Sequence, residues 1–112
     1  MIKYLIAAAI MAATATTASA QVLNKDHAKI MVCVMIGENA SLFAKGRMLG
    51  APESIMRTKV VNPTTDPLVK YMLSESLTAV YMIDEYKFNS MGEMAPSMFR
   101  DAAAATCINT PF

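Results

Sequence analysis

The pair of cysteines restricts the fold of this chain more than any other feature. Cys33 and Cys107 stand 74 residues apart (107 minus 33) in a sequence of 112 residues. On a chain-entropy model, a disulfide closing a loop of that length stabilises a fold by about 4.5 kcal/mol. This is comparable with the whole free energy of unfolding of a small domain. A fold with this bond must bring its first and last elements together.

The N-terminal segment indicates the compartment in which such a bond forms. Lys3 precedes the ten apolar residues 4–13 (YLIAAAIMAA), and the small-x-small pattern Ala18-Ser19-Ala20 precedes Gln21. These features predict a signal peptide over residues 1–20, cleaved between Ala20 and Gln21. The apolar stretch is shorter than the roughly 20 residues that span a bilayer. We therefore expect no membrane insertion of the mature chain and a location in the periplasm or outside the cell.

Cleavage leaves residues 21–112, which are 92 residues (112 minus 20) and enough for a single domain. Loss of Lys3 leaves nine basic residues against nine acidic ones, so the formal net charge is zero. We therefore expect no nucleic acid as a main partner, because its binding requires a clustered positive excess. In a small exported domain, two cysteines predict one structural disulfide. A reactive thiol is disfavoured because the chain has no C-x-x-C motif and its only histidine, His27, precedes Cys33 by six residues.

Capping and proline signals predict an all-α fold, a small four-helix domain whose first and last helices are joined by one disulfide. Asn24 and Gly50 delimit the first helix, Pro52 starts the second, Thr65 or Asp66 with Pro67 starts the third, and Pro96 lies in the first turn of the last. The expected helices cover residues 25–49, 52–60, 67–83 and 96–107. The run IMVCVMI (residues 30–36) also fits a buried strand, but no turn signal precedes it, which favours a helix.

Apolar spacing predicts which face of each helix is buried. The triplet Gly37-Glu38-Asn39 is expected to kink or split the first helix. Residues 84–90 (DEYKFNS) are interpreted as a connection, followed by an S-x-x-E capping box at Ser90 and Glu93. The predicted inward residues are Ile30, Cys33, Val34, Gly37, Ala40 and Ala44 in the first helix, Val69, Met72, Leu73, Leu77, Val80 and Tyr81 in the third, and Met98, Phe99, Ala102 and Thr106 or Cys107 in the last.

Catalytic residues are few. His27 is placed in the first turn of a helix, where a solvent-facing role is the ordinary one, and Asp84-Glu85 is most simply a solvated helix end. The chain has no G-x-S-x-G, no phosphate-binding glycine loop and no H-E-x-x-H motif. We expect no enzyme activity and no cofactor.

The methionines are the one group with ligand chemistry. Met91, Met94 and Met98 follow the i, i+3, i+7 spacing of one helix face, and thioether sulfur binds Cu(I) and Ag(I). The same spacing describes an ordinary buried stripe, and methionine is an adaptable core residue. An exposed surface for a protein partner is a third alternative.

Several segments together resemble a group of proteins. The first helix holds Cys33 and ASLFAKGRMLGAP (residues 40–52), the third holds AVY at 79–81, and the last begins at a proline and ends at Cys107. With the signal peptide, this resembles small, mostly uncharacterised two-cysteine all-helical periplasmic proteins of Gram-negative bacteria. In size, compartment and single disulfide the chain is also similar to periplasmic acid-stress chaperones and immunity proteins. The resemblance implies no catalytic residue.

Three functional hypotheses follow. The first is a non-enzymatic binding protein of the periplasm, such as an inhibitor, immunity protein or chaperone-like factor, with an envelope protein as partner and a homodimer as an alternative. The second is a Cu(I) or Ag(I) carrier that uses its methionines. The third is a phage-encoded accessory of envelope exclusion or lysis.

Overall fold

The long helix α2 is the element against which the other helices are arranged. A computed structural model describes the backbone of residues 18–111 and the side chains of residues 26–111. The elements are α2 (Ala18–Met48), α3 (Glu53–Met56), the π-helical turn η1 (Arg57–Val61), α4 (Pro67–Met82), α5 (Glu85–Met91), the 3-10 turn η2 (Gly92–Met94) and α6 (Ala95–Asn109). No strand occurs within residues 18–111.

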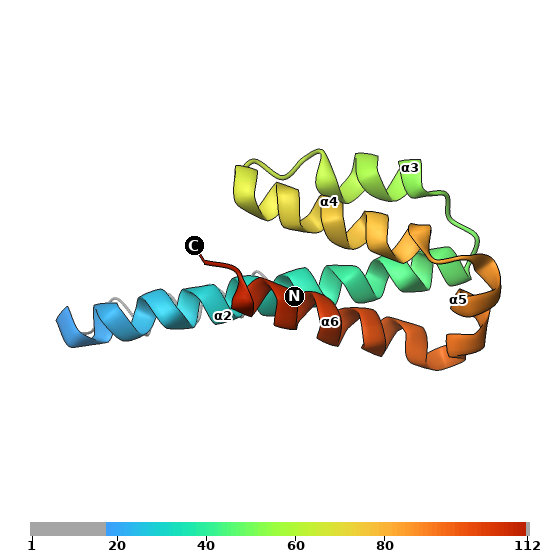
Figure 1. Ribbon diagram of the computed structural model, residues 1–112. Coiled ribbons are helices and arrows are strands. Elements are labelled where there is room, and N and C mark those ends of the chain that lie inside the picture. The colour runs from blue at the N-terminus through green and yellow to red at the C-terminus, as the bar shows by residue number, and fades with distance from the viewer. Residues whose placement is uncertain (1–17, 112) are drawn as a thin grey trace.

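The helices α4 and α6 both lie along α2, and α3 packs beside α4 (Figure 1). The first turns of α2 extend past the ends of the other helices, so the molecule is elongated, with principal extents of 52 × 25 × 24 Å. Cys33 and Cys107 join α2 to α6, with their sulfurs bonded at 2.08 Å and their Cα atoms 5.3 Å apart. The predicted all-α domain closed by this disulfide is confirmed.

Local signals explain where most of these helices begin and end. The Asp66 carboxylate accepts hydrogen bonds from the backbone N–H groups of Leu68 and Val69 at 2.9 and 3.1 Å, and Pro67 follows as the first helical residue. This satisfies donors that the first turn of a helix leaves unpaired. Pro96 lies in the first turn of α6, as predicted. The Asp66 cap and the two prolines thus define where α4 and α6, the two walls of the groove described below, begin.

The core lies where α2, α4 and α6 converge. Its buried apolar residues are Cys33, Ile36, Phe43, Ala44, Val61, Met72, Leu73, Leu77, Val80, Phe88, Ala95 and Cys107. The predicted inward face of α4 is confirmed, with Val69 and Tyr81 partly buried at its edges. In α2, Ile30 and Val34 were expected inside but are exposed, whereas Ile36 and Phe43 are buried. The reason is that α4 and α6 cover two neighbouring sides of α2, so the buried arc is displaced from the predicted stripe.

Four local predictions are wrong. Asn24 lies inside α2, which begins at Ala18, because residues 18–25 contain no glycine or proline to interrupt a helix. Gly37 neither kinks nor splits α2, which is continuous to Met48.

Residues 84–90 are mostly helical. The Asp84 carboxylate caps α5 by accepting from the Lys87 N–H at 2.9 Å. Ser90 lies inside α5, where its hydroxyl donates to the Tyr86 carbonyl at 2.8 Å, so it is not the N-cap that the predicted capping box with Glu93 requires.

The predicted signal peptide falls largely on residues 1–17, which lie outside the described residues. The predicted cleavage point between Ala20 and Gln21 falls in the first turn of α2. Cleavage there stays a prediction.

Candidate binding groove

A groove lies beside the core between α4 and α6, with α2 as its floor. Its volume is about 500 Å³, within the ~300–1,000 Å³ range of ligand sites. The groove is lined by Ile36 and Ala40 of α2, by Tyr71, Met72, Glu75, Ser76 and Ala79 of α4, and by Phe99, Ala102, Ala103, Thr106, Cys107 and Thr110 at α6.

Small side chains on the facing walls create this groove. Ala79 of α4 and Ala102 and Ala103 of α6 are too short to meet across the space between the two helices. On α2, Ile36 and Ala40 are fully buried and form an apolar floor. On the walls, Ala79, Ala102 and Thr106 are exposed, whereas the floor residues are buried. The groove is therefore open along one side.

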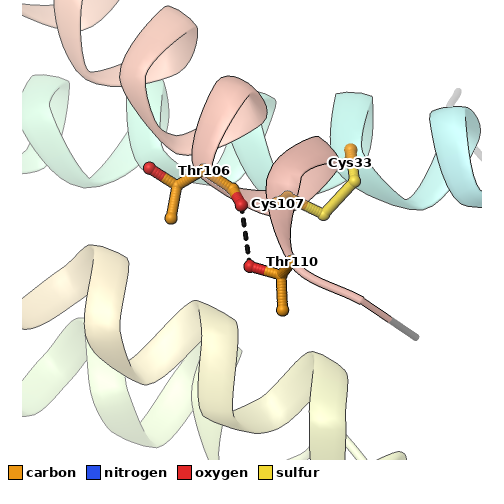
Figure 2. Close-up of a disulfide and its surroundings, with 4 residues drawn as sticks. All are labelled: Cys33, Thr106, Cys107 and Thr110. Carbon is orange, nitrogen blue, oxygen red and sulfur yellow. Dashed lines mark hydrogen bonds between the residues drawn. A yellow bond between two sulfur atoms is a disulfide. The ribbon is translucent and has the colours of Figure 1, made fainter.

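The disulfide fixes one end of the groove. Cys107 is both a lining residue and the partner of Cys33, and both cysteines are buried. Figure 2 shows the bond joining α2 and α6, with the Thr110 hydroxyl donating to the Thr106 carbonyl at 2.7 Å. That hydrogen bond closes the last turn of α6 beside the groove. The disulfide therefore links α6, one wall of the groove, covalently to α2, its floor.

Polar groups occupy the rim. Glu75 is the only charged residue among those lining the groove. The Tyr71 hydroxyl donates a hydrogen bond to the Glu75 carboxylate at 3.4 Å along the exposed edge of α4. Across from them, Thr106 and Thr110 carry hydroxyls on the other wall. The rim therefore has acidic character on the α4 side and neutral hydroxyls on the α6 side.

Hydrogen bonds on the far side of α4 hold it in place. The Arg47 guanidinium of α2 donates to the Val80 carbonyl at 2.6 Å and lies 4.3 Å from the ring centre of Phe88. The Tyr81 hydroxyl donates to the Ala51 carbonyl at 2.6 Å. Burial raises the pKa of the Tyr81 phenol above 10.0, an effect that Arg47 opposes and Glu53 reinforces. These contacts position α4 without using α6.

The three methionines proposed as metal ligands lie on three different elements. Met91 ends α5, Met94 ends η2, and Met98 lies in α6. Gly92, with a positive φ of 58°, breaks the helix between Met91 and Met94. A single helix face, the basis of the metal hypothesis, is therefore absent.

The surroundings of these methionines also differ. Met94 and Met98 are 67% and 46% exposed, whereas Met91 is partly buried against the core. Met91 lines a second hollow with Met82, Ile83, Asp84 and Lys87 at the junction of α4 and α5. The structure thus groups Met91 with Met82, and neither Met94 nor Met98 lines that hollow.

His27 is exposed near the start of the described side chains. Within residues 26–111, no three residues of the types His, Cys, Asp and Glu gather as a metal site would require. The groove was not predicted from the sequence. Ala102 and Thr106 were predicted to face inward, but both are exposed and line the groove. The signal available was the coincidence of small residues on two helices, Ala79 on one and Ala102-Ala103 on the other.

Comparison of the chain with models of protein families, with curated protein sequences and with solved structures found no match. Among the helices of the described part, none combines the length and the apolar character that crossing a membrane requires.

Proposed function

We propose that this chain is an exported, non-enzymatic binding protein of the periplasm, and that its groove receives the apolar face of an amphipathic helix of an envelope protein. The observation that carries the proposal is the groove itself, with a buried apolar floor and open, alanine-lined walls. The predicted signal peptide and the buried disulfide support an oxidising compartment outside the cytoplasm.

The shape of the groove favours a helix as its occupant. On α4 the lining runs from Tyr71 to Ala79 and at α6 from Phe99 to Thr110, which correspond to about 12 and 16 Å at 1.5 Å per residue. That length accommodates two to three helical turns. Ala79, Ala102 and Ala103 allow a close approach of another backbone, and the open side leaves the polar face of the incoming helix in water.

The rim adds a charge preference. The Glu75 carboxylate, the one charge in the lining, favours a lysine or arginine at the border of the partner's apolar stripe. An exposed pair of this kind is worth about 0.2–1 kcal/mol. Glu75 is therefore expected to orient the partner more than to hold it.

The lining also supports a role without catalysis. It offers one carboxylate, no histidine and no free thiol, because Cys107 is bonded to Cys33. Acid–base and nucleophilic mechanisms require a second group within hydrogen-bond reach of the first. The hydrogen-bond partner of the Glu75 carboxylate is the Tyr71 hydroxyl, at 3.4 Å.

Position-specific photocrosslinking in intact cells tests the proposal. A benzophenone amino acid at Ala102 lies in the groove, whereas the same residue at Ala105 is exposed on α6 outside it. We expect an adduct with an envelope protein from position 102 and none from position 105. Peptide mapping should place the adduct in an amphipathic helix of the partner.

The adduct should also depend on an empty groove. Ala79→Arg, on the opposite wall, should abolish the crosslink from position 102 while leaving the circular dichroism spectrum and melting temperature unchanged. Equal adducts from positions 102 and 105, or no adduct from either, would contradict the proposal.

A further inference from the structure

A second surface lies on the side of α2 that faces away from the groove. Its members repeat every three or four residues, which places them on one face of the helix. We define the outer stripe as Met31, Val34, Glu38, Leu42 and Lys45, continued by Leu49 in the turn that follows. Val34, Leu42 and Leu49 are 52%, 51% and 87% exposed. A soluble domain thus presents a row of branched apolar side chains to water, broken by one acid and one base.

The two charges of the outer stripe have no ion-pair partner within residues 26–111. The ion pairs found there are Glu53 with Arg57 and Arg100 with Asp101. Glu38 and Lys45 are separated by seven residues, about 10.5 Å along the helix, which is too far for them to pair with each other. In two antiparallel copies of the helix, however, Glu38 of each copy can face Lys45 of the other.

We propose that the outer stripe is the interface of a symmetric homodimer in which α2 packs antiparallel to α2 of a second copy. A two-fold axis between residues 41 and 42 brings Glu38 opposite Lys45 of the second copy, and the symmetry forms the same pair twice. The same register brings Val34 opposite Leu49 and places the two Leu42 side chains side by side at the axis. A two-fold contact requires this kind of self-complementary surface.

The proposal is independent of the groove. Ile36 and Ala40, the α2 residues that line the groove, are buried beneath α4 and α6, whereas Glu38 and Leu42 are exposed. A dimer formed through the outer stripe leaves both grooves open. A contact of one helix pair is small and belongs to the class of weak interfaces, so the dimer is expected to form only at high protein concentration.

Sedimentation equilibrium of the exported, disulfide-bonded protein at concentrations up to about 1 mM tests the proposal. Glu38→Lys and Lys45→Glu should each weaken the dimer by about tenfold, because each creates two like-charge contacts. The double variant, E38K with K45E, should restore the affinity to within about threefold of the original. An equimolar mixture of the two single variants should form a heterodimer.

Lys70→Glu, an exposed lysine change on α4, serves as the matched control and should leave the dimer unchanged. Leu42→Asp should abolish the dimer while the melting temperature of the monomer stays the same. A monomer at every concentration, or a double variant as weak as the single ones, would overturn the proposal. The charge reversal distinguishes this antiparallel register from a general apolar association.

Discussion

Helix α6 meets its two neighbours in contrasting ways. Against α2 it is bonded through Cys33 and Cys107, and it approaches so closely that a Cβ atom on Gly37 would lie 2.8 Å from the Arg100 carbonyl oxygen. Against α4 it leaves the groove, whose facing walls also carry small residues. Small side chains therefore permit close packing where the helices are held together and leave a hollow where they are not.

The disulfide is the strongest expected difference between the two contacts. Replacing both Cys33 and Cys107 by serine removes the loop constraint, and we expect the free energy of unfolding to fall by about 4 kcal/mol. The melting temperature should fall by roughly 20 °C, measured by circular dichroism. Helical content at low temperature should be mostly retained, because the caps of α4 are local. An unchanged melting temperature would show that packing alone closes α2 on α6.

The second largest loss of stability is expected at Gly37, where α2 and α6 are in close contact. In Gly37→Val the new side chain meets the Arg100 carbonyl and the Ala104 methyl, so α2 and α6 must separate. We expect a loss of about 2–3 kcal/mol in urea unfolding, as found for overpacked interiors. Ala105→Val, a β-branched change at an exposed position of α6, should cost less than about 1 kcal/mol and controls for helix propensity. Equal losses in the two variants would mean that Gly37 is not at a close contact.

The third prediction concerns the Tyr81 hydrogen bond, which holds α4 on the side away from the groove. Tyr81→Phe removes the hydrogen bond to the Ala51 carbonyl and should cost about 1 kcal/mol at neutral pH, measured by urea unfolding. Burial raises the pKa of this phenol in the folded state above 10.0, so folding favours its neutral form. Its contribution is fully present below pH 10 and is lost as the pH rises through the higher folded-state pKa. The difference between the original protein and Tyr81→Phe should therefore shrink at high pH; a constant difference would contradict this assignment.

The sequence predicted the positions of the main helices because their signals are local. Asp66 with Pro67 and the early proline of α6 act within a turn of their own position, and the cysteines fixed which helices meet. The helix α5 was missed because residues 84–90 look like a charged loop, although Asp84 is its N-cap. In this case a capping residue was present and was interpreted as solvated charge.

The groove could not be predicted for a different reason. Whether Ala102 is buried or lines a hollow depends on the distance between α4 and α6, and that distance is set by contacts elsewhere. On one side of α4 the Arg47 and Tyr81 hydrogen bonds fix its position, and at α6 the disulfide does so. Helical spacing gives the direction of a side chain but not the position of the helix that it faces. The outward placement of Val34 has the same cause.

The smallest expected effect has the opposite sign to that of Gly37. Ala102→Leu adds methyl groups inside the groove, where they cover apolar surface that water now contacts, so the free energy of unfolding should rise by up to about 1 kcal/mol. Ala105→Leu adds the same groups to an exposed position outside the groove and should leave stability within about 0.5 kcal/mol. Added side-chain volume is thus expected to lower the free energy of unfolding where α6 packs against α2, and to raise it where α6 faces α4 across the groove. A loss of more than about 1 kcal/mol in Ala102→Leu would show that α4 and α6 already touch at this position, and would remove the groove as a binding site.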